Sequence, residues 1–281
     1  MKKFLALMLA MIMALSLVAC GGSETADETD TQDEGGIVTV TPGKLTVATS
    51  PDFAPYEFYA IDDAGTPQLA GFDMALAQYI ADYLGLELEV VPMDFDGTIM
   101  ELANKAVDLG MAGYSPDPER EDSMDFSEIY YAGGQSFVCV QGNKDQFATL
   151  EDTNKAEYQI GAQIGSIQVK LANENSPEAD IVELTKVTDI IAELLAGTLD
   201  GAYIETAVAE SYAKNYPELC VVLPVPYDAE GSVVGVSKGN AELLAGVNEA
   251  IAAALSDGSM DQFVAEANEA ASGEIIEGLV G

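Results

Sequence analysis

Residues 74–91 read MALAQYIADYLGLELEVV, and this stretch decides the fold class. Over residues 74–84 the apolar side chains recur every three or four positions, which is the pattern of an amphipathic helix. Residues 87–91 then form a short run that ends in two valines, as is typical of a β-strand. Because a helix leads directly into a strand here, the sequence predicts an α/β fold with mostly parallel sheets.

The same alternation of strand and helix patterns is found on both sides of this stretch. Strand-like runs lie at residues 45–48 and 159–161, and a second helical pattern covers residues 243–255. The folded body has about 240 residues, which is enough for one large domain or for two lobes. The sequence has no internal repeat with a period of about 20 to 50 residues.

The N-terminus has the organisation of an export signal. Two lysines, Lys2 and Lys3, precede an apolar run at residues 4–14, and small residues follow this run. The run is shorter than the ~20 apolar residues that a membrane-spanning helix needs, and the sequence has no second stretch of that length. We therefore expect residues 1–19 to be a signal peptide.

A cysteine follows the signal sequence directly. Residues 17–20, LVAC, resemble the lipobox of bacterial lipoproteins, which implies cleavage before Cys20 and a diacylglycerol on its thiol. The alternative is an ordinary cleaved signal with an incidental cysteine. Residues 20–42 are acidic, small and almost without aromatic side chains, so we expect them to be a disordered, lipid-anchored linker.

The composition excludes several classes of function. With 48 acidic and 11 basic residues, the formal net charge is −37. Such a field repels phosphate backbones, so nucleic acid is excluded as a partner. The chain has no histidine, which rules out Ser-His-Asp triads, Cys-His pairs and histidine metal sites. It also has no P-loop and no GxGxxG sequence, and we expect no metal and no cofactor.

Two further cysteines, Cys139 and Cys220, lie in apolar runs. They are too far apart in sequence for a CxxC metal or redox site. They are either two buried strand thiols or a disulfide of an exported protein, because the sequence does not give the Cα separation that a bridge requires.

Arg120 is the most informative single residue, because the other ten basic residues are all lysines. It ends the segment AGYSPDPER at residues 112–120, which follows the strand-like residues 107–111. Ligands of α/β proteins normally bind at this end of a strand. A guanidinium offers two parallel donors to a carboxylate, which lysine does not. The alternative is a surface ion pair with a neighbouring acid, Glu119, Glu121 or Asp122.

The segments around Arg120 resemble the family 3 solute-binding proteins of amino-acid ABC importers. The resemblance spans nearly the whole mature chain and is carried by seven collinear pieces, at residues 44–58, 70–73, 94–97, 112–120, 125–131, 160–168 and 199–205. It implies a periplasmic-binding-protein-like α/β fold with two lobes and a two-strand hinge. The implied boundaries are 43–132 and 232–281 for lobe 1 and 133–231 for lobe 2, with hinge crossings at residues 131–135 and 230–232.

The resemblance also implies a site for the backbone groups of a free amino acid. Arg120 and Ser115, with the backbone of Gly113 nearby, would hold the α-carboxylate from lobe 1. Ser166 would add a hydroxyl and free N–H groups from lobe 2, at the start of a helix. Glu205 stands where the family usually has aspartate, and it would receive the α-ammonium.

The walls around the ligand side chain follow from the same resemblance. Phe53 and Phe95 would sandwich this side chain, with Tyr56 close by, although such aromatic residues are more often part of a core. Ser50 stands where binders of basic amino acids carry aspartate, and Gln163 lies on the lobe 2 wall. These residues suit a polar or a cationic amino acid. We expect Asp73 to cap the helix that starts at Met74.

Together these features predict a monomeric receptor, not an enzyme, on the outer face of the cell membrane. It would close around a free amino acid and deliver it to an ABC permease and its ATPase. The alternatives are an enzyme of the dehydratase type, or a ligand sensor, on the same fold.

Overall fold

The computed structural model describes residues 36–62, 64–228 and 231–272. The chain divides into a segment up to Gly36 and a compact unit from Ile37 onward. The expected signal peptide, Cys20 and the linker up to residue 35 lie outside the described residues. No helix in the described part of the chain is long and apolar enough to cross a bilayer.

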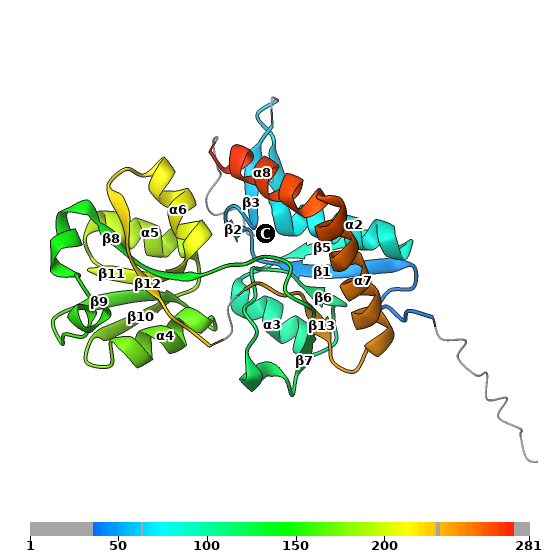
Figure 1. Ribbon diagram of the computed structural model, residues 1–281, viewed down its shortest axis with the longest axis horizontal. Helices are drawn as coiled ribbons and strands as arrows, with labels where there is room; N and C mark the ends of the chain where they lie inside the picture. Colours follow the sequence, from blue (N-terminus) through cyan, green and yellow to red (C-terminus); the bar gives the residue numbers. More distant parts are fainter. Residues whose placement is uncertain (1–35, 63, 229–230, 273–281) are drawn as a thin grey trace, which may run out of the picture. The chain divides into compact units, whose positions relative to one another are not determined.

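Two five-stranded sheets organise the compact unit (Figure 1). The first has the strand order β5-β1-β6-β13-β7 and the second has the order β10-β9-β11-β8-β12. The first consists of β1 Lys44–Thr49, β5 Glu87–Pro92, β6 Leu109–Gly110, β7 Met124–Phe126 and β13 Gly235–Ser237. The second consists of β8 Gln135–Val140, β9 Gln159–Gln163, β10 Asp180–Leu184, β11 Gly201–Glu205 and β12 Leu219–Val225. A small sheet, β2-β3-β4, comprises β2 Asp52–Phe53, β3 Glu57–Ile61 and β4 Pro67–Ala70.

The two large sheets are built in the same way. In the first, β1 pairs in parallel with β5 and β6, whereas β13 pairs antiparallel with β6 and β7. In the second, β9 pairs in parallel with β10 and β11, whereas β8 pairs antiparallel with β11 and β12. The parallel part of each sheet therefore contains the strand and helix alternation that the sequence predicts, and the antiparallel strands make both sheets mixed.

Helices cover both faces of each sheet, which explains why the strands are apolar on two sides. Successive side chains of β1 point to opposite faces. Leu45 and Val47 pack in the core with helices α2 and α7, whereas Ala48 packs in another cluster with α3. In the second sheet, α5 and α6 cover one face and α4 the other. The helices are α2 Phe72–Leu84, α3 Phe95–Ala103, α4 Ile167–Asn175, α5 Val187–Ala196, α6 Thr206–Asn215, α7 Ala241–Asp257 and α8 Ser259–Ala271. Three short 3-10 helices are η1 Pro118–Arg120, η2 Gln141–Gln146 and η3 Leu150–Thr153.

The stretch that decides the fold class forms helix α2 and strand β5, as expected. Gly85 ends α2 with φ 68°, and its N–H bonds to the carbonyl oxygen of Asp82. Glycine adopts this left-handed conformation without the steric cost that a Cβ brings. The turn sends the chain into β5, which pairs with β1 over six residues.

The chain crosses between the two large sheets at two places, after β7 and after β12. The crossings touch each other, because Tyr131 and Ser232 form an antiparallel bridge and the Ser232 N–H donates to the Tyr131 carbonyl oxygen at 2.8 Å. Apolar packing also continues from one sheet to the other, since one cluster includes side chains of α2, α5 and α6. Glu230, part of the predicted second crossing, lies outside the described residues.

The two cysteines of the folded body face each other as thiols. Cys139 on β8 lies directly opposite Cys220 on β12, and their sulfur atoms are 3.8 Å apart. Burial raises the pKa of the Cys139 thiol to about 12, and the adjacent Cys220 adds to this. Because the thiolate is the reactive form, this shift makes Cys139 less reactive than an ordinary thiol.

Candidate functional site

The predicted ligand-binding residues lie where strands of the two large sheets end. Ser50 follows β1, and residues 113–120 follow β6 in the first sheet. Ser166 follows β9, and Glu205 ends β11 in the second sheet. The carboxyl ends of parallel strands are the usual binding edge of an α/β sheet. The region where the two edges meet is therefore the candidate site.

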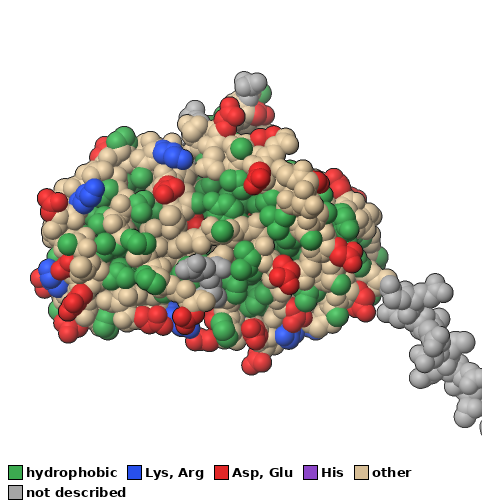
Figure 2. All heavy atoms as spheres, in the orientation of Figure 1, with side chains coloured by type: hydrophobic (Ala, Val, Ile, Leu, Met, Phe, Trp, Pro, Cys, Tyr) green, Lys and Arg blue, Asp and Glu red, His purple; other side chains and the backbone are tan. Residues whose placement is uncertain are grey.

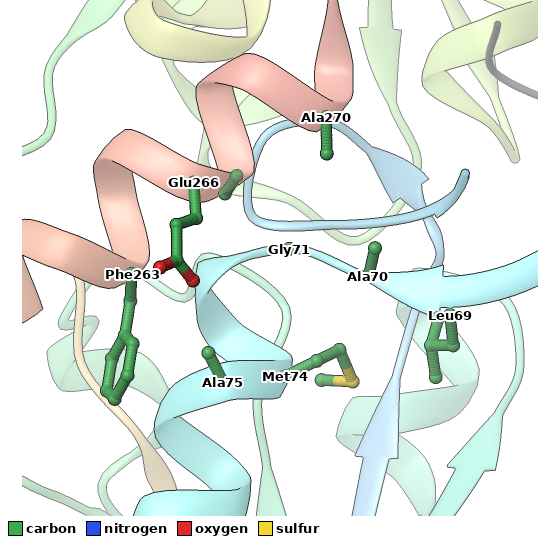
Figure 3. A pocket seen from close by; sticks show the side chains of 9 residues that line it. Leu69, Ala70, Gly71, Met74, Ala75, Phe263, Glu266 and Ala270 are labelled. Atoms are coloured by element: carbon green, nitrogen blue, oxygen red, sulfur yellow. The ribbon is translucent and has the colours of Figure 1, made fainter. Parts of the chain in front are cut away.

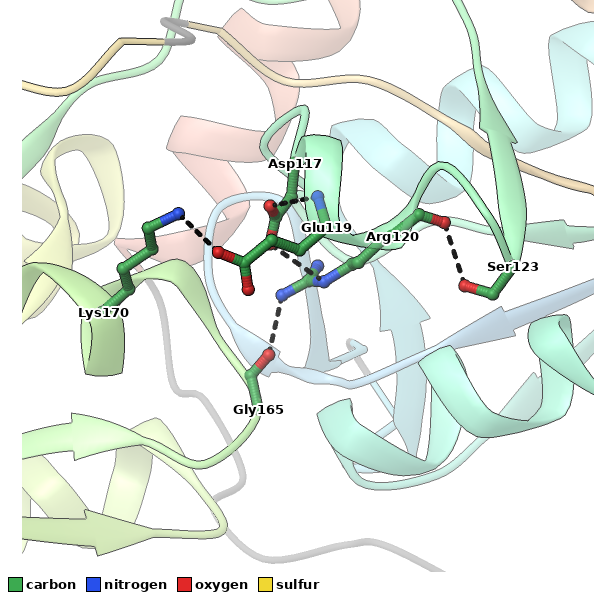
Figure 4. A network of polar contacts seen from close by, with 6 residues as sticks. All are labelled: Asp117, Glu119, Arg120, Ser123, Gly165 and Lys170. Carbon is green, nitrogen blue, oxygen red and sulfur yellow. Dashed lines mark hydrogen bonds and ion pairs between the residues drawn. The ribbon is translucent and has the colours of Figure 1, made fainter.

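Arg120 reaches from the first sheet to the second (Figure 4). Its Nη2 donates to the carbonyl oxygen of Gly165 at 2.7 Å, and its Nε lies 3.5 Å from Asp117 Oδ2. The side chain is only 14% exposed, and burial lowers the pKa of the guanidinium. Arg120 thus pairs with an acid of its own loop, as in the expected alternative, but the partner is Asp117 rather than Glu119, Glu121 or Asp122. Its guanidinium is largely shielded from solvent and lies at the turn that precedes α4.

The start of α4 faces this guanidinium. Ser166 is the residue before the helix, and its hydroxyl donates to the carbonyl oxygen of Gln163 at 2.6 Å. The hydroxyl proton is thus already used, and no side chain caps the first turn of α4. The backbone N–H groups there remain the donors for an anion, together with the positive end of the helix dipole. Ser115 is buried on the Arg120 side.

Glu205 is a buried carboxylate at the junction of β11 and α6. Its Oε2 accepts from the N–H of Val208 at 2.9 Å, and its Oε1 accepts from the N–H of Gly134 at 3.3 Å. The first bond caps α6, as expected for an acid at this end of a helix. Burial raises the pKa of the carboxyl to about 7, whereas these bonds and the nearby Tyr56 hydroxyl lower it. A cationic group brought to this carboxyl would favour its ionised form and so gain a partner of opposite charge.

The predicted aromatic residues are buried and packed. Phe53 is 6% exposed, and its ring lies 5.3 Å from that of Tyr56. Phe95 is 7% exposed, and its ring meets that of Tyr114 edge-on at 5.6 Å. A Cβ on Gly113, which has φ 59°, would lie 2.6 Å from a carbon of the Phe53 ring. Residue 113 must therefore be glycine for the Phe53 ring to approach it. The expected sandwich of a ligand side chain between the Phe53 and Phe95 rings stays a prediction.

Ser50 and Gln163 both bind a residue that the sequence reasoning missed, Asp52. The Ser50 hydroxyl donates to Asp52 Oδ1 at 2.8 Å, and Gln163 Nε2 lies 3.3 Å from Oδ2. The backbone N–H of Val187, at the start of α5, donates to the same Oδ2 at 2.6 Å. Burial raises the pKa of Asp52 to about 6. The signal in the sequence was its place between two predicted site residues, Ser50 and Phe53.

A second missed residue, Glu57, lies beside Asp73 behind the site. Both carboxyl oxygens of Glu57 are buried without a hydrogen-bond partner among the described residues. Burial, with Asp73 next in effect, raises the pKa of Glu57 well above its usual range. Asp73 accepts from the Tyr130 hydroxyl at 2.7 Å and from the Gly113 N–H at 3.1 Å. The expectation that Asp73 caps α2 is wrong, because Gly71 is the cap residue and no side chain caps this helix.

These carboxyls make the stability of the unliganded protein depend on pH. Burial raises the pKa values of Asp52 and Asp73 to about 6 and that of Glu205 to about 7. The folded state therefore holds protons that the unfolded chain releases between about pH 4 and 7, so the free energy of unfolding falls as pH rises through this window. We expect a higher melting temperature at pH 5 than at pH 7.5 by differential scanning fluorimetry. A melting temperature that rises over this interval would contradict the assignment.

Several hollows lie near these residues, and the one beside Glu205 includes a predicted site residue. One of about 360 Å³ lies beside the loop of Arg120 and the start of α4, and it is lined by Pro116, Asp117, Pro118, Ile167, Lys170, Leu171, Glu174, Pro226, Tyr227 and Asp228. A hollow of about 360 Å³ lies between the start of α2 and α8 (Figure 3). It is lined by Leu69, Ala70, Gly71, Met74, Ala75, Phe263, Glu266, Ala267 and Ala270. Another hollow, of about 250 Å³, opens beside Glu205, Gly133 and Gly134. Acidic side chains are scattered over the face shown in Figure 2, so the net charge does not mark a site there.

Residues 45–267 match the family described as bacterial extracellular solute-binding proteins, family 3. The chain is 32% identical over 267 residues to the arginine-binding extracellular protein ArtP of Bacillus subtilis, covering 94% of this chain and 96% of that protein. It is 29% identical over 187 residues to cyclohexadienyl dehydratase of Pseudomonas aeruginosa, covering 66% of this chain and 68% of that protein.

A solved structure has the same arrangement of elements. It is the amino acid ABC transporter substrate-binding protein AbpA from Streptococcus pneumoniae bound to L-arginine, with a TM-score of 0.78. The two chains are 31% identical, and the match covers 83% of this chain and 97% of that one.

Proposed function

Because the chain belongs to family 3 of the bacterial extracellular solute-binding proteins, we propose that it binds a free amino acid of the arginine type for an ABC importer. The observation that carries this proposal is that opposite charges lie at the starts of two helices of the second sheet. Arg120 is a largely shielded cation beside the start of α4, and Glu205 is a buried carboxyl at the start of α6. A zwitterion has one group for each of them.

The chemistry of binding follows from these two residues. The α-carboxylate would lie against the guanidinium of Arg120 and the N–H groups at the start of α4, where the helix dipole favours a negative charge. The α-ammonium would lie against Glu205 and so keep that carboxyl ionised. The Phe53 and Phe95 rings would flank the side chain, and a cationic side chain would gain about 0.5–2 kcal/mol from such a contact.

We further propose that the two lobes, 43–132 with 232–281 and 133–231, move about the crossings near Tyr131 and Ser232. The bridge between these two residues holds the crossings together, and a hinge motion there would rotate the two sheets as units. Arg120 bonding to the Gly165 carbonyl oxygen would then belong to the closed arrangement.

The test of the proposed function is a thermal-shift screen of the twenty amino acids. A ligand at 100 times its Kd stabilises the folded state by about 2.7 kcal/mol, which is readily measured. We expect arginine to give the largest shift. If no amino acid stabilises the protein, the proposal is wrong. Conversion of a bound compound, detected by mass spectrometry of the eluted ligand, would instead favour an enzyme like the dehydratase relative.

We propose that a lipid on Cys20 holds the mature protein at the outer face of the cell membrane. There it would present its ligand to a permease and its ATPase. The support is the sequence LVAC at residues 17–20. We expect Cys20→Ala to leave ligand affinity unchanged and to move the protein from the membrane fraction to the medium, or to leave uncleaved precursor. Fractionation and immunoblotting measure where the protein is found. A cleaved Cys20→Ala protein that stays in the membrane fraction would exclude the anchor.

A further inference from the structure

The carboxylate of Asp52 lies between the two sheets and is held there by neutral donors alone. Asp52 is on β2 and is 6% exposed. Its oxygens accept from the Ser50 hydroxyl, the Gln163 amide and the Val187 N–H, at 2.8, 3.3 and 2.6 Å. Its own carbonyl oxygen accepts from the Tyr212 hydroxyl at 3.1 Å. Three of these four partners come from elements of the second sheet, so Asp52 lies at the boundary between the sheets.

This carboxylate has no cation of its own among the described residues. The ion pairs there are Lys44–Glu89, Arg120–Asp117, Lys170–Glu119 and Lys238–Asp125. Removing a carboxylate from water costs several kcal/mol, and neutral hydrogen bonds recover only part of this cost. Burial accordingly raises the pKa of Asp52, with Lys186 only the smallest of the groups that lower it. A positive charge brought to Asp52 would relieve this penalty.

Asp52 differs from the other buried acids around the site because its carboxylate contacts both sheets. In the proposed function, Arg120 takes the α-carboxylate and Glu205 takes the α-ammonium. Asp73 is also buried, but its hydrogen-bond partners Tyr130 and Gly113 belong to the same predicted lobe, and it lies beside Glu57, whose pKa burial raises well above its usual range. Asp52 instead contacts residues of both sheets and directly precedes Phe53, a predicted wall of the side-chain slot.

We propose that Asp52 is the residue that determines specificity, by receiving the cationic end of the ligand side chain. Ser50 and Gln163 are positioning residues in this scheme, because each donates to Asp52 and so orients its carboxylate. The acid that is absent at position 50 is thus supplied two residues later in the chain. This inference rests on the proposed function, and it names the chemical class of the side chain as guanidinium or ammonium.

The test compares L-arginine with L-citrulline, which has the same shape but a neutral urea in place of the guanidinium. We expect wild-type protein to bind arginine at least about 30-fold more tightly than citrulline in calorimetric titrations, as for a charge pair inside a closed site. Asp52→Asn keeps the size and one oxygen acceptor but removes the charge. It should weaken arginine binding by about 30-fold or more and change citrulline binding by less than about 3-fold.

The control is Asp108→Asn. Asp108 is also buried and accepts two backbone N–H groups, from Val40 and Thr46, but it lies outside the site. We expect it to leave the ratio of the two affinities unchanged. Asp52→Glu, which keeps the charge, should retain the preference for arginine even where the affinity itself falls.

Several results would overturn the inference. Equal losses of arginine and citrulline affinity in Asp52→Asn would show that Asp52 only holds the sheets together. Equal binding of arginine and citrulline by wild-type protein would also overturn the inference. This comparison needs no variant, so the inference can be tested even if Asp52→Asn does not fold. Stabilisation by neutral amino acids alone would refute this inference and leave amino-acid binding intact, whereas no stabilisation by any amino acid would refute the proposed function itself.

Discussion

Arg120→Lys is expected to weaken amino-acid binding by about 30-fold or more while the protein folds normally. Lysine keeps the positive charge but loses the planar pair of donors, so one carboxylate oxygen would be left imperfectly paired inside the closed site. The loss should be similar for every amino acid that binds, because the α-carboxylate is common to all of them. Calorimetric titration of wild-type and variant protein measures the effect.

The chain offers a matched control for this substitution. Lys170 on α4 pairs with Glu119 at 3.1 Å, so it also joins the second sheet to the loop of Arg120, but both side chains are well exposed. Exposed ion pairs contribute little, and we expect Lys170→Ala to change affinity by less than about 3-fold. Equal effects of the two substitutions would mean that Arg120 acts only in closing the site. An unchanged affinity in Arg120→Lys would refute the carboxylate assignment.

Glu205→Gln is the second substitution with a large expected effect, and it should separate affinity from stability. Glutamine keeps an oxygen that accepts from Val208 N–H, so the cap of α6 is preserved. It removes the charge that would pair with the α-ammonium, and we expect about a 30-fold or larger loss of affinity. Because burial raises the pKa of Glu205 to about 7, the unliganded variant should be at least as stable as wild type at pH 8.

The measurements are titration with arginine and thermal unfolding without ligand, both at pH 8. Glu210→Gln is the control, since Glu210 is an exposed acid on the same helix α6. We expect this control to leave both quantities unchanged. An affinity loss that is matched by an equal loss of stability would show that Glu205 serves the fold and not the ligand.

Much of the fold could be predicted because it follows from local patterns. The helix pattern at residues 74–84 became α2, and the seven collinear pieces identified a family and a periplasmic-binding-protein fold that the comparisons confirm. The antiparallel strands β8 and β13 were harder to predict from the sequence, because their partners depend on how the chain crosses between the sheets. The pairing of Cys139 with Cys220 could not be foreseen for the same reason.

The candidate site was predictable only where one residue carries the chemistry by itself. Arg120 stood out as the single arginine, and Glu205 by its place in a family segment. Asp52 and Glu57 did not stand out in a chain with 48 acidic residues. What sets them apart is burial and contact with residues far along the chain, such as Val187 for Asp52, and neither is visible in local sequence.

The Asp73 prediction failed for a related reason. An acid near the first turn of a helix normally stabilises its N-terminus, so the local pattern favoured a cap. In the fold, Gly71 with φ 118° brings the start of α2 against the backbone of Tyr56. The carboxylate of Asp73 is then buried, where it accepts from Tyr130 and Gly113.

The central claim, that this protein binds a free amino acid of the arginine type between its two sheets, is tested most directly by titrating the mature protein with L-arginine in a calorimeter and identifying the compound released on denaturation. We predict one saturable site per chain and recovery of unchanged arginine. Absence of binding heat, together with no thermal stabilisation by any of the twenty amino acids, would contradict the claim.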